Sequence, residues 1–290
     1  MELRLPNWVR ALILVSALMQ LCFAATLLAD PGRIAELWPW PLPPLTARLL
    51  GASTLVSVPM AVLLVWINRF GVAAIALVMM LTYRVLQLLA GGIHHDRFAP
   101  DSLVTLNYFG GGLLMAATFA YPLWAGYKGQ LPQARPNAPL GVPMPWRLPA
   151  LARTGLAVLG DAYVALGLAF LVLGAAAKPL WFDVAGITPL TARLFASPLM
   201  GLGLGLILVS RAQDWRAIFV PAIGMVTIGI VGTASLLLDR SLFAPQSPAA
   251  WAVAATPPVL LLVGLALLWS RRSVLPHART TGAVAMRKAA

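Results

Sequence analysis

Residues 40–53 read WPLPPLTARLLGAS, and the hexapeptide PLTARL inside this stretch occurs a second time in the chain. The first copy runs from Pro44 to Leu49 and the second from Pro189 to Leu194, within GITPLTARLFAS. The copies lie 145 residues apart in a chain of 290 residues, so each half carries one. Proline followed by threonine two residues later suits a helix start, which predicts that a helix begins at each copy.

Two further landmarks recur at the same distance of 145 residues. Phe98-Ala99-Pro100 matches Phe243-Ala244-Pro245, and Trp124 matches Trp269. Three matches in one register predict an internal duplication. The sequence therefore divides into a first repeat (1–124), a Pro-rich linker (125–152), a second repeat (153–270) and a basic tail (271–290).

The composition is typical of a membrane protein. Hydrophobic residues make up 60% of the chain and charged residues 10%, whereas a soluble domain has about 25% charged residues. A helix needs about 20 apolar residues to cross a hydrocarbon core of about 30 Å. Eight segments meet this requirement: 8–29, 45–67, 70–92, 103–124, 153–175, 190–210, 216–238 and 249–270. We predict an all-α integral membrane fold, with eight transmembrane helices arranged as two parallel four-helix repeats.

Basic residues are distributed unevenly between the two sides that this topology defines. The side with both termini and the linker carries fourteen of the 21 Lys and Arg residues, the other side carries six, and Arg84 lies within a helix. The positive-inside rule places both termini in the cytoplasm, and the PLTARL copies at the outer ends of their helices. The net charge of +12 follows this topology and does not indicate nucleic-acid binding. Arg outnumbers Lys eighteen to three, a sign of a GC-rich bacterial genome, so the expected location is the bacterial cytoplasmic (inner) membrane.

The string WPWPLPPLTARLLGA, residues 38–52, resembles a W-P-W-x-L-x-P-L-T-A-R signature of uncharacterised bacterial multi-pass membrane proteins. A looser similarity, in helix count and size, is to DoxX-like proteins, which are four-helix membrane units of about half this length. The resemblance implies a tandem of such units. It transfers no functional residues, because it rests on no shared site motif.

Arg48 and Arg193 occupy the same position in the two PLTARL copies. One interpretation is that each arginine anchors its helix at the interface or pairs with a loop carboxylate, which could be Asp96, Asp239, Asp30 or Glu36. The other is that the two arginines form a receptor for an anionic group, because guanidinium binds carboxylate and phosphate bidentately.

Tryptophans precede both copies. Trp38 and Trp40, like Trp181, suit the aromatic belt at the membrane interface, and the alternative is that they form a ligand platform. The prolines of the first loop stiffen it, which predicts a rigid cover over the outer mouth of the bundle.

Asp161 and Arg84 are ionisable residues inside predicted spans. We expect the Asp161 carboxylate to face the bundle interior or to be neutral, and Arg84 either to extend outward or to pair with Asp161. Their counterparts in the other repeat are Ser16 and Gly229, so an intramembrane polar site would be asymmetric. Five further polar residues could join it, although interhelical hydrogen bonding alone would explain most of them: Gln20, Tyr83, Gln87, Asn107 and Tyr163.

Metal and cofactor binding are not expected. His94, His95 and Asp96 adjoin one another, but His277 lies across the membrane and a metal site needs more ligands. The single cysteine, Cys22, excludes intrachain disulfides and cysteine-based zinc sites.

Helix-breaking residues fall at corresponding places in the two halves. Gly110-Gly111-Gly112 lies in the fourth predicted span and Pro257-Pro258 in the eighth. Such paired breaks point to a transporter-like binding site, whereas the alternative is close packing at the glycines and a simple kink at the prolines.

The leading functional expectation is a non-enzymatic protein that binds or transports a small amphipathic or anionic compound from the outer face. The expected partners are the lipid bilayer and this ligand. The second hypothesis is a structural or assembly subunit that docks a membrane protein partner. The third is a membrane-embedded enzyme with Asp161, Asp96 or His95 as acid or base, although no catalytic constellation recurs.

Overall fold

The computed structural model describes residues 3–32, 40, 42–133, 144 and 146–273, without the side chain of Leu103. Within these residues, six helical segments are long and apolar enough to cross a membrane. They are α1 (Asn7–Ala29), α3 with α4 (Pro44–Leu55 and Ser57–Ile67), α5 (Phe70–Ile93), α8 with η3 (Ala150–Leu173 and Gly174–Leu180), α9 (Pro189–Arg211) and α10 (Trp215–Leu238). The prediction of a multi-pass, helical membrane protein is confirmed at this level.

The two remaining predicted spans are interrupted helices. α11 (Pro248–Ala254) and α12 (Thr256–Trp269) are bent by 44° relative to each other and would together make a seventh span. The segment predicted at 103–124 is divided into α6 (Leu103–Leu106), the π-helical η2 (Asn107–Gly111) and α7 (Gly112–Tyr127). Both interruptions fall where the glycine triplet and the proline pair predict them, and a total of eight spans stays a prediction.

The PLTARL copies start helices, as their sequence predicts. Pro44 is the first residue of α3 and Pro189 the first of α9, where a missing backbone N–H costs no hydrogen bond. Before α9, the hydroxyl of Thr188 accepts the backbone N–H of Thr191 at 3.2 Å and caps the helix. The interruption between α3 and α4 lies just before Pro59, whose ring cannot coexist with a regular bond to the carbonyl four residues earlier.

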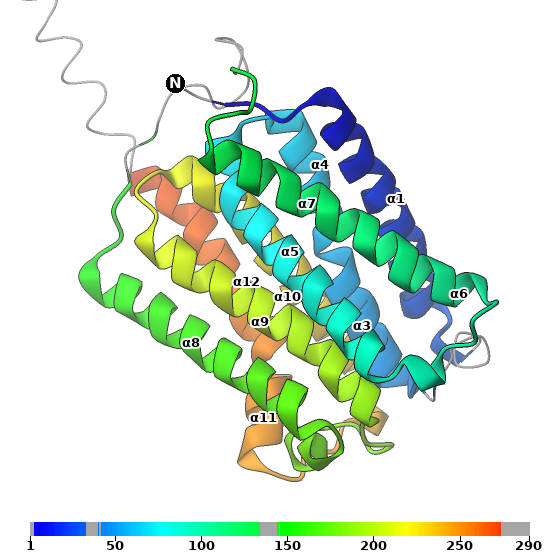
Figure 1. Cartoon of the computed structure of the whole chain (residues 1–290). Helices are drawn as coiled ribbons and strands as arrows, with labels where there is room; N and C mark the ends of the chain where they lie inside the picture. Colours follow the sequence, from blue (N-terminus) through cyan, green and yellow to red (C-terminus); the bar gives the residue numbers. More distant parts are fainter. Residues whose placement is uncertain (1–2, 33–39, 41, 134–143, 145, 274–290) are drawn as a thin grey trace, which may run out of the picture.

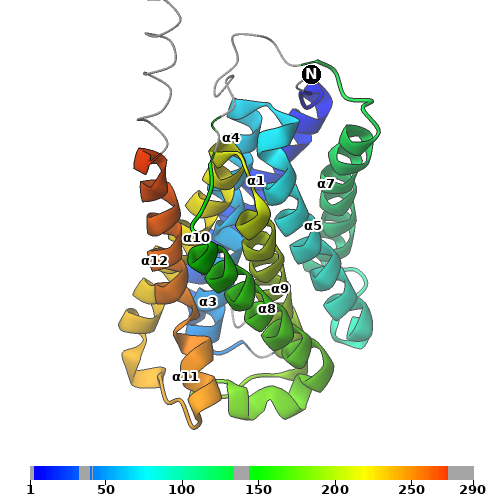
Figure 2. The ribbon, with the colours of Figure 1, turned by 90° about the vertical axis from the view of Figure 1, so that its left-hand side faces the viewer.

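The middle of the bundle is formed by α3 with α4, α5, α9 and α10, while α1, α7, α8 and α12 lie outside them (Figures 1 and 2). α3 packs against α10 and α5 packs against α9, so the two halves of the chain interlock. We call the end where α3 and α9 begin the PLTARL end. The first described residues and the end of α12 both lie at the opposite end, and Arg4 donates its backbone N–H there to the carbonyl of Pro132 at 2.7 Å.

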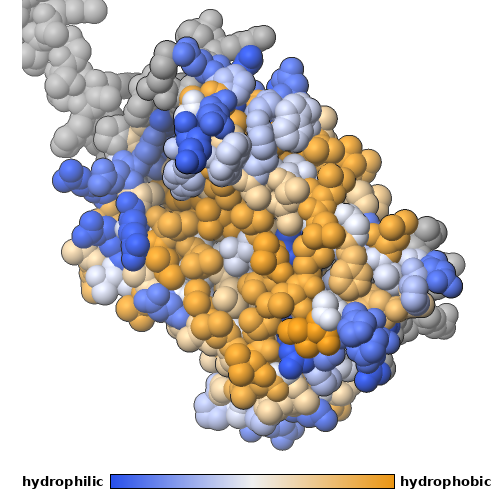
Figure 3. Space-filling model, in the orientation of Figure 1, coloured by the Kyte–Doolittle hydropathy of each residue, from blue (hydrophilic) through white to orange (hydrophobic). Residues whose placement is uncertain are grey.

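The surface has the polarity of a protein embedded in lipid. Figure 3 shows hydrophobic residues covering the middle of one face and hydrophilic residues gathered toward its ends. Four exposed tryptophans lie near helix ends away from the PLTARL end: Trp8, Trp66, Trp124 and Trp269. Exposed tryptophans at one end of a helical bundle are typical of an aromatic belt at a membrane interface.

Close helix contact at glycine determines which way α8 faces. A Cβ on Gly160 would lie 2.7 Å from the carbonyl oxygen of Gly203 in α9, and a Cβ on Gly203 would meet the Gly160 carbonyl at the same distance. Because Gly160 faces α9, the next residue, Asp161, is rotated outward and its side chain is exposed. The expectation that Asp161 faces the bundle interior is therefore wrong.

Candidate functional site

The two PLTARL arginines contact residues in the opposite half of the chain. Arg48 of α3 forms an ion pair with Asp239, which follows α10. Arg193 of α9 hydrogen-bonds through Nη1 to Nε2 of His94, which follows α5, at 2.5 Å. Each arginine also donates from Nε to a backbone carbonyl. Arg48 donates to Leu28 of α1 at 3.3 Å, and Arg193 donates to Leu171 of α8 at 3.1 Å. Both guanidinium groups thus have protein partners, and a receptor role for them stays a prediction.

Two buried indoles make a second pair of crossed contacts. Trp40 of the first half donates from Nε1 to Thr191 Oγ1 at 3.1 Å, and Trp181 of the second half donates to Thr46 Oγ1 at 3.3 Å. The two tryptophans are 4% and 3% exposed. The aromatic-belt interpretation of both is therefore wrong, because a buried indole N–H requires an acceptor and the PLTARL threonine of the other half supplies it. Trp38 lies outside the described residues.

Asp183 is a buried carboxylate that the sequence interpretation missed. It lies between η3 and α9, accepts the hydroxyl of Thr46 at 2.9 Å and accepts the backbone N–H of Ala185 at 3.0 Å. Burial raises the pKa of its carboxyl group, and the two hydrogen bonds oppose that effect. Because Thr46 also accepts from Trp181, the first PLTARL copy is fixed to the loop of the second half.

We expect the PLTARL end to be sensitive to acid at His94, the partner of Arg193. Burial, reinforced by the Arg193 charge, lowers the pKa of His94, while Asp96 opposes the shift. The unfolded chain, with a histidine pKa of about 6.5, therefore takes up a proton at higher pH than the folded protein. The contribution of His94 to stability is therefore fully present above the histidine pKa of the unfolded chain. It is lost as the pH falls from that value toward the lower pKa of the folded protein.

We expect the free energy of unfolding to decrease from pH 7.5 to pH 5, and His94→Gln to reduce this decrease. His95→Gln is the matched control, because His95 is the exposed neighbour of His94. Thermal unfolding of the wild type and both variants across this pH range measures the difference. Loss of the pH dependence in His95→Gln instead would contradict the assignment.

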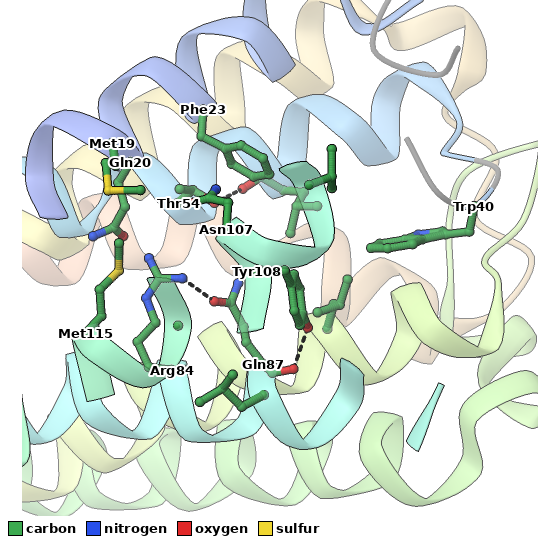
Figure 4. Close-up of a pocket in the computed structure, with 15 residues that line it drawn as sticks. Met19, Gln20, Phe23, Trp40, Thr54, Arg84, Gln87, Asn107, Tyr108 and Met115 are labelled. Carbon is green, nitrogen blue, oxygen red and sulfur yellow. Dashed lines mark hydrogen bonds between the residues drawn. The ribbon is translucent and has the colours of Figure 1, made fainter. Parts of the chain in front are cut away.

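A cavity of about 260 Å³ lies between α1, α3, α5 and the interrupted segment α6–η2–α7 (Figure 4). We call it the arginine cavity. Its polar lining consists of Gln20, Thr54, Arg84, Gln87, Asn107 and Tyr108. Its apolar lining consists of Met19, Phe23, Trp40, Leu50, Leu88, Val104, Gly112, Met115 and Leu194. Polar groups thus gather inside an otherwise apolar enclosure.

Arg84 carries the charge of this cavity. Figure 4 shows its guanidinium reaching inward from α5, and Nη1 donates to Gln87 Oε1 at 2.6 Å. Its guanidinium carbon lies 5.4 Å from the ring centre of Tyr83. Across the ranges that the structure describes, Arg84 has no carboxylate partner, whereas Arg48, Arg97 and Arg216 each form an ion pair with an aspartate.

The interrupted segment forms the outer wall of the arginine cavity. Tyr108 in η2 donates its hydroxyl to the carbonyl of Gln87, and its ring lies where a Cβ on Gly91 would be 2.3 Å from a ring carbon. Gly112 similarly faces Leu88, which a Cβ would approach to 2.8 Å. Glycines on both helices therefore let the π-helical turn pack closely against α5, and π-helical turns are frequent at functional sites.

Two smaller cavities lie in the interface between the halves. The methionine cavity, of about 40 Å³, is bordered by Met60, Met79 and Met80 and also by Arg84. The tryptophan cavity, of about 60 Å³, is bordered by Trp181, Phe182 and Pro257, the last at the start of α12. The interruption at the glycine triplet thus borders the arginine cavity through Gly112, and the interruption at the proline pair borders the tryptophan cavity through Pro257.

The other predicted site residues are not brought to these cavities. Asp161 lies exposed on α8, and Asp96 lies 3.4 Å from Arg97 in an exposed ion pair. His95 is exposed beside them in η1 (His95–Arg97). In the described part of the chain, no three His, Cys, Asp or Glu side chains form a group that could hold a metal ion.

No family model matches this chain, and no curated protein or solved structure is significantly similar to it. The resemblance to tandem DoxX-like units therefore stays a prediction, and the arginine cavity is the best-defined candidate site.

Proposed function

We propose that this protein binds an amphipathic anion, with the anionic group on Arg84 in the arginine cavity. The observation that carries the proposal is a guanidinium in an apolar enclosure between membrane helices, without a carboxylate partner among the described residues. A guanidinium has five N–H donors, and Gln87 accepts one of them. A charged side chain inside a span is costly unless it pairs, and a bound carboxylate or phosphate supplies that pair.

The surroundings of Arg84 support an amphipathic ligand. Gln20, which lines the cavity with Arg84, is 3% exposed, and its side chain is held in place by a hydrogen bond to Ser16 Oγ at 3.0 Å. Phe23 and Met115 also line the cavity (Figure 4). A hydrophilic anion would leave these apolar walls without contacts. An anion with a hydrocarbon chain uses both kinds of lining.

Access from the lipid is the route that we propose. Met19 of α1, 39% exposed, and Asn107 of η2, also exposed, border the arginine cavity on its lipid-facing side. Arg84 lies nine residues before the end of α5, which corresponds to a depth of about 14 Å from the PLTARL end. With the excess of basic residues on the opposite side, we place the PLTARL end outward, so the ligand enters from the outer leaflet.

We also propose that the two halves are duplicates. The crossed contacts support this, because 193 minus 48 and 239 minus 94 both equal the 145-residue offset of the PLTARL copies. Arg84 then corresponds to Gly229, whose Cβ would lie 2.5 Å from Leu261 Cβ, so the second half has no room for an arginine there. One anion site per chain follows from this asymmetry.

Equilibrium binding to the full-length protein in lipid nanodiscs tests the proposed function. We expect saturable binding of radiolabelled dodecanoate with one site per chain. Unlabelled dodecyl phosphate should compete, whereas dodecanol and dodecylamine, which share the chain but lack an anionic group, should not. Equal competition by dodecanol would contradict an anion site, and non-saturable uptake would contradict a defined site.

A further inference from the structure

The three cavities lie next to one another in a series through the bundle. The arginine and methionine cavities share Gln20 and Arg84 in their linings. The methionine and tryptophan cavities share four residues: Ser53, Pro198, Leu202 and Ile228. The series therefore runs from the arginine cavity, between the two halves, to the broken helix α11–α12.

The polarity of the series changes along its length. The arginine cavity has a cation and five other polar side chains. The tryptophan cavity is enclosed by apolar side chains apart from Ser53 and Thr256, and the Ser53 hydroxyl already donates to the carbonyl of Leu50 at 2.8 Å. One end of the series suits an anionic head group and the other end suits hydrocarbon.

The two end cavities also occupy corresponding places under the 145-residue offset. Leu50, Thr54 and Gln87 border the arginine cavity, and their counterparts Phe195, Leu199 and Gly232 border the tryptophan cavity. Leu199 and Gly232 stand where the first cavity has Thr54 and Gln87, so the second cavity lacks these two hydrogen-bonding side chains. A duplicated pair of cavities has thus become one polar and one apolar compartment.

Methionine side chains line the middle cavity. Met79 and Met60 side chains fill the space beside Gly205 and Gly224, where a Cβ would lie 2.5 Å from each sulfur. Methionine is unbranched and adapts its shape to neighbouring groups. Rotation of these side chains would join the methionine cavity to its neighbours.

We propose that the hydrocarbon tail of the ligand passes from the arginine cavity through the methionine cavity into the tryptophan cavity. This inference rests on the proposed function and narrows the ligand to a single-chain amphiphile. A water-sized group requires about 10–15 Å³, and a methylene group is of similar size. The two smaller cavities, of about 40 and 60 Å³, therefore have room for about seven to ten such groups. The carbons next to the anionic group lie in the arginine cavity, so the ligand is a carboxylate or phosphate with a chain of about ten carbons or more.

Photo-crosslinking of the full-length protein in nanodiscs tests the path of the tail. Two dodecanoate probes carry a diazirine, one beside the carboxyl group and the other at the chain end. We expect the first probe to label Gln20 or Asn107. The second should label Leu199, Val253 or Pro257, which border the tryptophan cavity.

Variants of Ile228, which borders both smaller cavities, separate this inference from the proposed function. Ile228→Phe should reduce labelling of the tryptophan cavity at least about fivefold and leave labelling by the carboxyl-side probe unchanged. Ile228→Leu, which conserves the volume, should retain both patterns. If Ile228→Phe does not fold, the wild-type label positions decide alone.

The chain-end probe could instead label only outward-facing residues such as Leu18 and Leu113. That result would overturn the proposed path of the tail without contradicting the anion site at Arg84. If the carboxyl-side probe also labels only such residues, the proposed function fails as well.

Discussion

Replacing Arg84 with glutamine should abolish most of the anion binding without lowering the stability of the protein. Removing one partner of a buried charge pair costs about 2–5 kcal/mol, so dodecanoate affinity should fall at least about 30-fold. The ligand-free protein should not be destabilised, because the substitution removes a charge without a carboxylate partner among the described residues. Nanodisc binding and thermal unfolding of the same preparation measure both effects.

Two matched variants sharpen this prediction. Arg84→Lys retains the charge but loses the planar, bidentate geometry, so its affinity should be intermediate. Arg97→Gln removes one positive charge from an exposed site and should bind dodecanoate like the wild type. If Arg84→Gln unfolds the protein at a lower temperature and retains its affinity, the arginine is structural.

Replacing Arg48 with methionine should produce the largest loss of stability among these substitutions. The side chains of Arg48 and Asp239 are 21% and 12% exposed, and removing one member of a buried pair costs about 3–5 kcal/mol because the other charge is left unpaired. Arg193→Met is the matched substitution in the second PLTARL copy. Its partner is the imidazole of His94, so the loss should be about 1.5–3 kcal/mol, the range for a hydrogen bond to a charged group.

A double-mutant cycle with Asp239→Asn isolates the Arg48–Asp239 interaction. Equilibrium unfolding of the four proteins should give a coupling free energy well above the additivity error of about 0.5 kcal/mol. Additive effects of Arg48→Met and Asp239→Asn would contradict a stabilising pair between the halves.

The helical segments and their interruptions were predictable from the sequence, because apolar length, glycine and proline act locally. Pro44 and Pro189 start helices, and the breaks occur at the glycine triplet and the proline pair. These features depend on a few neighbouring residues. The residues of the other half that these helices contact were harder to predict.

The orientation of side chains within the bundle was not predictable for a physical reason. A transmembrane helix is apolar all round, so its sequence does not mark an inner face as an amphipathic helix of a soluble protein does. Asp161 faces outward because Gly160 contacts Gly203, which is a long-range contact. The indole N–H of Trp40 can be buried because Thr191 of the other half accepts it. The burial of Asp183 was not predictable, because its partner Thr46 lies 137 residues away in the sequence.

The most direct test of the anion site is the contact between the ligand carboxyl group and Arg84. Solid-state NMR on protein with ¹⁵N-labelled arginine and dodecanoate with a ¹³C-labelled carboxyl group detects this contact through their dipolar coupling. A charge-assisted hydrogen bond has an N···O distance of about 2.7–2.9 Å, so we predict a strong coupling in the wild type that Arg84→Gln removes. A coupling that persists in Arg84→Gln, or its absence in the wild type with ligand bound, would contradict the proposed site.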